Sequence, residues 1–371
     1  MGEELTLFPL EFNRSVRIEA RPERLTSEVG ALAAREVLER SSIIDWLAER
    51  IDDPRDPEAV THPTREVLRT EILLPVQGWR DHDDADACRE DPTLRLAVSE
   101  RAGDKPLRPR PEHEKGSKNP THPDGLASQP TLSRATDWLA AKKNRQVLRE
   151  ALCEQAAWRL RQSNRGHRQR YVTIDVDSLP IDVHGQQKGS EYNGHYGRRV
   201  FHPIVATAAE LGDLLDVRLR AGSAHTSEGD LGFILPLLDR VEENLCQVAA
   251  VRIDAGYPDE ELLCALETRR TPYVSRVRNN KVLNRMAAPY LKRPAGRRPV
   301  EPRTWTYELY YKAETWSRKR RVVLVVMERP DDLYLHHFWL ITNWSQEQIS
   351  GEELLEHYRQ RGTAARATLA N

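Results

Sequence analysis

The chain has 371 residues, with 56 Lys and Arg against 57 Asp and Glu, so its net charge of −1 points to no particular class of partner. Its mean hydropathy is −0.67 and no apolar run approaches the length of a membrane span, which predicts a globular protein outside membranes. The first residues lack the basic-then-apolar order of a signal peptide, and the four cysteines form no CxxC pair. We therefore expect reduced thiols and a cytoplasmic location.

The first half of the chain has the pattern of helices and a linker. Helical patterning covers residues 25–39, 43–51 and 65–76. A stretch rich in Pro, Gly, Lys and Arg follows, and helical patterning then returns. These patterns predict an N-terminal helical region over residues 1–102, a linker or loop over 103–130 and a helical connection over 131–169.

From residue 170 the chain changes to short apolar runs that predict strands. Three strands joined by Gly-containing turns precede a helix, a strand, a helix and a strand. This is the element order of a ribonuclease H-like sheet, so we predict an α/β fold with a mixed sheet and flanking helices over residues 170–278. In that layout the first strand neighbours the strand after the first helix. The predicted strands are 171–177, 199–206, 214–219, 248–254 and 273–277, and the predicted helices are 226–244 and 258–268.

The remaining segments interrupt this core and then complete it. Residues 279–335 contain an alternating aromatic stretch and a continuous apolar run at 322–327, which predict a basic, β-rich insertion. Residues 336–371 predict the last core strand, at 337–342, and a C-terminal helix at 346–369.

Two carboxylates stand where predicted strands end. Asp177 closes the first apolar run and Asp254 closes the run that follows the first core helix. A carboxylate at a strand exit is well placed to hold a hard divalent cation, and two such groups can share metal ions for phosphodiester chemistry. Asp175 projects from the same strand face as Asp177 and is a candidate supporting group or alternative ligand. Two solvated surface carboxylates are the alternative for the Asp175–Asp177 strand alone, but the pairing with Asp254 favours metal binding.

Positive charge and aromatic rings gather in residues 269–321. This segment holds 16 Lys and Arg against 3 Asp and Glu, with Tyr and Trp interleaved. Cations neutralise phosphates and aromatic faces stack on unpaired bases, so the segment predicts polyanion binding and does not separate DNA from RNA. An ordinary basic face is the weaker interpretation. The candidate DNA-binding residues are Arg276, Arg278, Lys281, Arg297, Arg298, Trp305, Arg318, Lys319 and Arg320.

Residues 184–187 and 193–196 form a polar, Gly-rich turn after Asp177. Contact with a substrate and a plain hairpin turn are equally compatible with their composition.

A set of short motifs, in sequence order, carries a resemblance to a known family. It comprises Gly78-Trp-Arg-Asp-His-Asp83, Arg89-Glu-Asp-Pro92, Leu126-Ala-Ser-Gln-Pro-Thr-Leu-Ser133, Asp175-Val-Asp-Ser178, His184-Gly-Gln186, His202-Pro203, Leu219-Arg-Ala-Gly222 with His225, Arg252-Ile-Asp-Ala-Gly256, Leu340-Ile-Thr-Asn343 and Tyr358-Arg-Gln-Arg-Gly362. In these motifs the chain resembles DDE-type transposases of bacterial insertion sequences, in the branch with DxDS/T at the first aspartate. The likeness runs from about residue 20 to residue 362.

The resemblance implies a ribonuclease H-like catalytic core and an N-terminal helical region that helps to bind the ends of the element. Asp177 matches the first family aspartate and Asp254 the second. In the family, two Asp and one Glu hold two Mg²⁺ (or Mn²⁺) ions that activate water or a 3'-hydroxyl for attack on DNA. The implied partner is double-stranded DNA at terminal inverted repeats, bound by a homodimer associated with the nucleoid.

The third carboxylate is where the sequence departs from the family. The related motif is Tyr, two residues, Arg, three residues, Glu, six residues, Lys, and Tyr358 and Arg361 fit it. Ala365 stands at the Glu position, and the Lys position would be one beyond Asn371. We therefore expect a C-terminally truncated enzyme that is inactive in strand cleavage.

Two other functions compete with this one. A DNA-binding remnant that occupies the element ends without cutting is supported by the basic, aromatic insertion and by the nearly complete N-terminal region. A metal-dependent phosphohydrolase for small phosphates needs only the two carboxylates, but the basic insertion is excessive for a small substrate.

Overall fold

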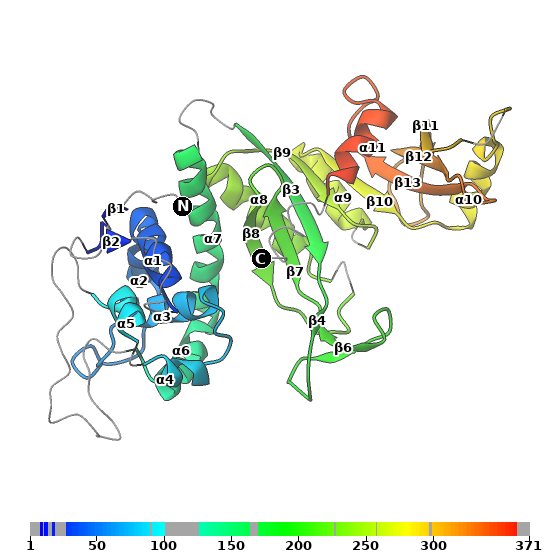
Figure 1. Cartoon of the computed structure of the whole chain (residues 1–371). Coiled ribbons are helices and arrows are strands. Elements are labelled where there is room, and N and C mark those ends of the chain that lie inside the picture. Colours follow the sequence, from blue (N-terminus) through cyan, green and yellow to red (C-terminus); the bar gives the residue numbers. More distant parts are fainter. Residues whose placement is uncertain are drawn as a thin grey trace, which may run out of the picture. The chain divides into compact units, whose positions relative to one another are not determined.

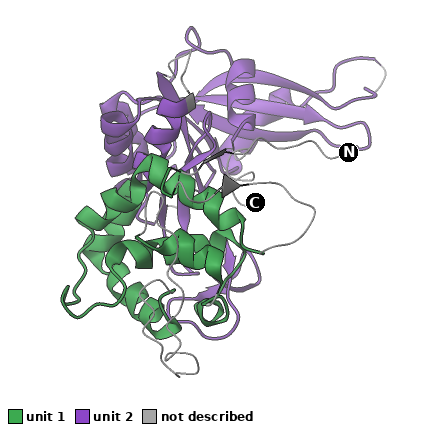
Figure 2. Ribbon diagram, turned by 60° about the vertical axis from the view of Figure 1, so that its left-hand side comes forward, with its two compact units in different colours: residues 1–151 green, residues 152–371 purple. Residues whose placement is uncertain are grey.

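The computed structural model describes residues 8–9, 11–13, 17–18, 27–89, 91–100, 126–163, 170–225, 228–256, 258–296 and 299–361. The chain divides into two compact units, Met1–Ala151 and Leu152–Asn371 (Figure 2). The finer segment boundaries predicted from the sequence stay predictions.

The first unit is helical around one apolar core. Helices predicted at 25–39, 43–51 and 65–76 are present as α1, α2 and α3, and leucines such as Leu32, Leu47 and Leu68 lie in the core. The elements are β1 (Phe8–Pro9), β2 (Arg17–Ile18), α1 (Gly30–Ser41), α2 (Ile43–Arg50), α3 (Thr64–Val76), α4 (Asp83–Ala87), α5 (Pro92–Val98) and α6 (Gln129–Leu139).

Helix α7 (Lys142–Ser163) begins in the first unit and ends in the second. It has 22 residues and carries many charged side chains. Within the ranges that the structure describes, no helix is both long and apolar enough to cross a membrane.

The second unit is built on an eight-stranded mixed sheet with the order β11-β12-β13-β10-β9-β3-β7-β8 (Figure 1). Strands β3, β7 and β8 form an antiparallel meander, whereas β9 lies parallel to β3 and β10 parallel to β9. This arrangement is the ribonuclease H-like order, and the predicted neighbourhood of the first strand and the strand after the first helix is confirmed. The core elements are β3 (Tyr171–Ser178), β7 (Ile204–Ala208), β8 (Asp213–Arg218), α8 (Leu231–Asn244), β9 (Gln247–Ile253), α9 (Glu260–Arg269) and β10 (Tyr273–Val277).

The alternation of side chains along β3 gives the sheet two different faces. Val172, Ile174 and Val176 are fully buried in the core that α8 and α9 help to form. Successive side chains of a strand point to opposite faces, so Asp175 and Asp177 face away from this core. The carboxylates therefore lie on the other face of the sheet, where α11 (Gly351–Arg359) packs.

The prediction of one strand at 199–206 is wrong, because the structure has two strands in this range. β6 (Arg198–Phe201) ends before His202 and β7 begins at Ile204. Pro203 has no N–H to donate to a ladder, which breaks the pairing at this point. β6 leaves the main sheet and forms a small sheet with β4 (Ile181–Asp182) and β5 (Glu191–Asn193), in the order β4-β6-β5.

The segment predicted as a β-rich insertion, residues 279–335, begins with a helix and then continues the core sheet. α10 (Lys281–Ala287) and a short 3₁₀ turn (Ala288–Tyr290) come first. The long strands β11 (Arg303–Tyr311) and β12 (Arg320–Glu328) then join the sheet through β13 (His336–Thr342), which pairs with both β12 and β10. Figure 1 shows these strands extending away from β3.

The helix predicted at 346–369 begins later than expected, and residues 362–369 of that range lie outside the described residues. α11 begins with a capping box between Ser350 and Glu353, seats Leu354 and Leu355 against the sheet, and ends at Arg359. Ala365 lies outside the described residues.

Gly222 allows the loop after β8 to lie directly on the small sheet. A Cβ at this position would meet the carbonyl oxygens of Val200 and Glu191 at 2.1 and 2.4 Å, and Asn193 donates to the Gly222 carbonyl. Because backbone atoms cannot swing aside, an added methyl group must separate the loop from the sheet.

We expect Gly222→Ala to destabilise this contact by about 3 kcal/mol, the upper end of the cost of overpacking. The backbone amides of β5 and β6 should then exchange their hydrogens faster than in the unaltered chain. Gly194→Ala is the matched control, because a Cβ there meets nothing within 4 Å. Equal protection in the two variants would contradict the close approach.

Candidate active site

Asp177 and Asp254 lie side by side at the ends of two parallel strands. Val176 of β3 pairs with Ile253 of β9, so the residues that follow them occupy neighbouring positions. Asp177 is the penultimate residue of β3, and Asp254 directly follows β9. The register of the parallel pair thus brings together two carboxylates that stand 77 positions apart in the sequence.

One guanidinium contacts both carboxylates. Nη1 of Arg361 lies 3.3 Å from Oδ2 of Asp177, and its Nη2 lies 3.3 Å from Oδ1 of Asp254. The Arg361 side chain is 18% exposed, and Nη1 is buried without a hydrogen-bond partner. Tyr358, the other residue of the predicted helix motif, lies on α11 with its ring 5.6 Å from the guanidinium carbon.

Burial sets the electrostatics of this group. It raises the pKa of Asp177, and Asp254 and Asp175 raise it further, against the opposing effects of Arg361 and of the Ser178 N–H. Burial alone would lower the pKa of Arg361, but the negative charges around it, those of Asp177 and Asp254 included, raise it. The two ionised carboxylates carry more negative charge than the single guanidinium compensates, which favours the binding of a divalent cation.

Asp175 has a different environment from Asp177. It is 3% exposed, and its two oxygens accept hydrogen bonds from Nε and Nη2 of Arg252, at 2.5 and 2.9 Å. Nη1 of Arg252 donates to the carbonyl of His357 on α11, at 2.8 Å. This buried pair fastens α11 to β3 and β9, which suits the supporting role predicted for Asp175 better than the role of alternative ligand.

The turn around Tyr196, which the sequence left open between a substrate contact and a plain hairpin, lies near the carboxylates. Burial raises the pKa of Tyr196, and the charges of Asp177 and Asp254 raise it further. The Tyr196 ring packs edge-on against His195 and against His202, which is buried. The signal in the sequence was the position of the turn soon after Asp177.

Arg220 was not among the predicted site residues, although it lies in one of the family-like motifs. Its Nη2 donates to Oγ of Ser178 at 2.8 Å, and its Nε donates to the carbonyl of His202 at 2.9 Å. Arg220 thus ties the end of β3 to the connection between β6 and β7. Its sequence position, just after β8, gave no sign of this long-range contact.

The described residues fit one divalent cation. Two carboxylates from adjacent strands supply the hard oxygen ligands that Mg²⁺ prefers, and Mg²⁺ is commonly held by one or two carboxylates together with waters and phosphates. In the described part of the chain, no group of three or more His, Cys, Asp or Glu side chains is arranged to hold a metal. Asp177 and Asp254 are therefore a partial donor set.

Some of the predicted DNA-binding residues lie at the end of the sheet where the carboxylates are. Arg276 is exposed on β10 with its guanidinium 4.6 Å from the centre of the Phe338 ring. Arg278 is exposed beside a cavity of about 270 Å³ that Ala255 and Gly256, next to Asp254, also line. Lys281 is the exposed first residue of α10.

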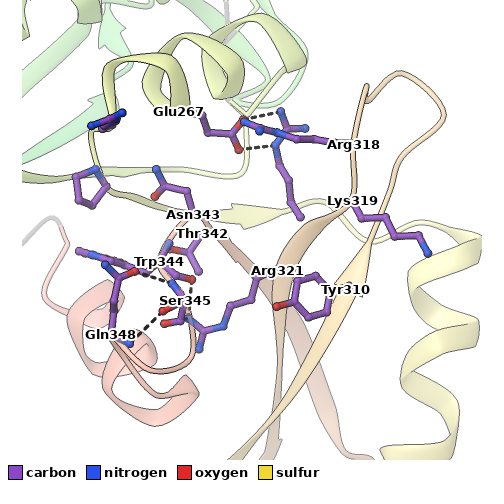
Figure 3. A pocket seen from close by; sticks show the side chains of 13 residues that line it. Glu267, Tyr310, Arg318, Lys319, Arg321, Thr342, Asn343, Trp344, Ser345 and Gln348 are labelled. Atoms are coloured by element: carbon purple, nitrogen blue, oxygen red, sulfur yellow. Dashed lines mark hydrogen bonds and ion pairs between the residues drawn. The ribbon is translucent and has the colours of Figure 1, made fainter.

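A second group of basic residues lines a pocket of about 520 Å³ (Figure 3). Pro272, just before β10, also lines this pocket, whereas Asp254 follows the residue that pairs with Ser275, so the pocket lies toward the other end of β10. Arg320 is 4% exposed and pairs with Glu260 and Glu267, and Arg318 also pairs with Glu267. Lys319 is exposed and extends away from Glu267. Only part of the charge counted in the sequence is therefore free to meet a ligand.

The other predicted DNA-binding residues are Trp305, Arg297 and Arg298. Trp305 is half-buried in β11, with Arg303 5.9 Å from its ring. Arg297 and Arg298 lie outside the described residues.

Comparison with known proteins gives a family for the chain. Residues 8–367 match the family described as transposase DDE domain group 1. Among solved structures, the chain is similar to a piggyBac transposase in a synaptic complex with hairpin DNA, with a TM-score of 0.41 and 12% identity, over 94% of this chain and 68% of that chain. A comparison with curated proteins gives no match.

We expect Asp175→Asn to lower the free energy of unfolding by about 3–5 kcal/mol, because it leaves the Arg252 charge buried without an ionised partner. Urea unfolding followed through tryptophan fluorescence measures this loss. Asp177→Asn is the matched control, and should change stability by less than about 1 kcal/mol, since its partner Arg361 is loosely held. Equal losses in the two variants would contradict different roles for the two aspartates.

Proposed function

Because the chain belongs to the DDE transposase domain family, we propose that it acts on the terminal inverted repeats of a bacterial insertion sequence, with Asp177 and Asp254 as its metal-holding carboxylates. The observation that carries this proposal is the convergence of both carboxylates, from adjacent parallel strands, on one guanidinium. A small phosphate substrate would not need the many basic residues of β10, α10 and the β11–β12 turn, whereas a DNA duplex has phosphates for them to contact.

Each residue of the site has a part in this function. Asp177 and Asp254 would hold Mg²⁺ or Mn²⁺, which when bound polarises phosphodiester oxygens and neutralises developing charge. Arg220 positions the end of β3 through Ser178. Tyr196 places a phenol near the carboxylates, where it can donate a hydrogen bond to a phosphate oxygen.

We propose that this chain is inactive in strand cleavage, because it lacks one of the three carboxylates that the family uses. Ala365 stands where the family resemblance places the third carboxylate. A site that fixes its metal ions with two carboxylates holds the reacting groups less well, and a misplacement of about 1 Å costs on the order of 100-fold in rate. A non-cleaving protein that occupies the element ends is the second candidate, supported by the exposed cations of the basic segment.

The test of cleavage uses DNA carrying the repeats that flank the gene, with Mg²⁺ or Mn²⁺ and gel detection of nicks. We expect nicking by the chain to be slower than by Ala365→Glu by on the order of 100-fold or more, and nicking by Ala365→Glu to vanish when Asp177→Asn is added to it. Robust Mg²⁺-dependent nicking by the unaltered chain would contradict its inactivity. Specific binding with no nicking by either protein would favour the second candidate.

DNA binding is tested by the salt dependence of affinity for a repeat-containing duplex. Each lost phosphate contact should reduce the slope of log K against log salt by about one unit. We expect this reduction for Arg278→Ala and for Lys319→Ala. Lys312→Ala is the matched control, an exposed cation of the same segment outside the candidate set. An equal effect of all three variants would indicate a diffuse basic face in place of defined contacts.

A further inference from the structure

The guanidinium of Arg361 lies where a cation shared by the two carboxylates would be expected. We propose that Arg361 is a built-in cation of this site: it partly compensates the charges of Asp177 and Asp254 in the metal-free protein, and a divalent ion binds their oxygens only when the guanidinium withdraws. This inference rests on the proposed function, because it takes these carboxylates to be the metal ligands.

The oxygens that Arg361 contacts are those that a metal ion would need. Oδ1 of Asp177 accepts the N–H of Ser178 at 2.8 Å, and Oδ2 is the atom next to Nη1 of Arg361. Oδ1 of Asp254 is next to Nη2. The guanidinium and a metal ion are therefore alternatives at these two atoms.

Charge balance explains why a cation is present at all. Two carboxylates at neighbouring positions repel each other, and burial of Asp177 strengthens that repulsion. Among the ion pairs of the described residues, Arg361 is the one cation that contacts either group, since nearby Arg252 binds Asp175. Without a metal ion, its removal leaves the carboxylates uncompensated.

The Arg361 contacts are loose enough to exchange. Charge-assisted N–H···O bonds are about 2.7–2.9 Å long, whereas both Arg361 contacts measure 3.3 Å and Nη1 makes no hydrogen bond. The neighbouring pair of Arg252 and Asp175 has two bonds of 2.5 and 2.9 Å. The site thus contains one fixed arginine and one releasable arginine.

Release of Arg361 does not require α11 to move. Leu354 and Leu355 seat α11 in the core, and Arg252 holds the carbonyl of His357. Arg361 follows the helix, two residues beyond its last residue, Arg359. A change in the Arg361 side chain alone can therefore free the carboxylates.

The measurement is Mn²⁺ affinity of the full chain, by calorimetry or by electron paramagnetic resonance of free Mn²⁺, at fixed pH and ionic strength. We expect Arg361→Gln to bind Mn²⁺ about 10-fold more tightly than the unaltered chain, because the ion no longer has to break two partly exposed ion pairs. Arg361→Lys keeps a positive charge, so its Mn²⁺ affinity should lie between those of Arg361→Gln and the unaltered chain. Arg359→Gln, which removes an exposed charge from the same helix end, should change affinity less than about 2-fold.

Thermal unfolding gives a second readout. In EDTA, Arg361→Gln should unfold at a lower temperature than the unaltered chain. Mn²⁺ should raise the unfolding temperature of Arg361→Gln by more than it raises that of the unaltered chain. Equal or weaker Mn²⁺ binding by Arg361→Gln would overturn the inference, as would an equal gain in Arg359→Gln.

The carboxylate variants distinguish a failure of this inference from a failure of the proposed function. If Asp177→Asn and Asp254→Asn each abolish Mn²⁺ binding while Arg361→Gln does not tighten it, this inference fails and the proposed metal ligands stand. If neither Asp177→Asn nor Asp254→Asn alters Mn²⁺ binding, these carboxylates are not the metal ligands. The proposed function and this inference then both fail.

Discussion

The parallel pairing of β3 with β9 is the constraint on which the rest of the site depends. Its register places Asp177 beside Asp254, and the alternation of β3 directs the acidic face away from the apolar core. Two like charges brought together in a half-buried place destabilise the fold unless cations accompany them. The acidic residues therefore require positively charged side chains beside them, and Arg252 and Arg361 supply these charges.

Helix α11 is the element that meets this need. It packs on the face of the sheet opposite α8 and α9, and arginines on both sides of the contact join it to the acidic residues. Arg252 comes from the sheet and reaches the helix, whereas Arg361 comes from the end of the helix and reaches the sheet. The first contact holds the architecture and the second balances the charge.

Local pattern predicted much of this architecture. The strand ends at Asp177 and Asp254, their adjacency and the helix between them follow from periodicity and element order. The division at His202 and Pro203, and the addition of β11 and β12 to the core sheet, depend on pairing between distant segments, which periodicity does not specify. The contacts of Arg220 with Ser178 and of Arg361 with both aspartates are of the same long-range kind.

The basic segment shows why a count of charges overstates a binding surface. Among the Lys and Arg of this segment that the structure describes, six form ion pairs with carboxylates inside the second unit, namely Arg269, Arg293, Arg303, Arg318, Arg320 and Arg321. Arg320 and Arg321 are buried, and a buried charge is stable only with its partner, so these two are part of the fold. The exposed cations, such as Arg278 and Lys319, remain able to neutralise phosphates. The same reasoning separates Arg252 from Arg361: burial with full hydrogen bonding marks a structural charge, and a loose, partly satisfied contact marks a charge that is free to change its partner.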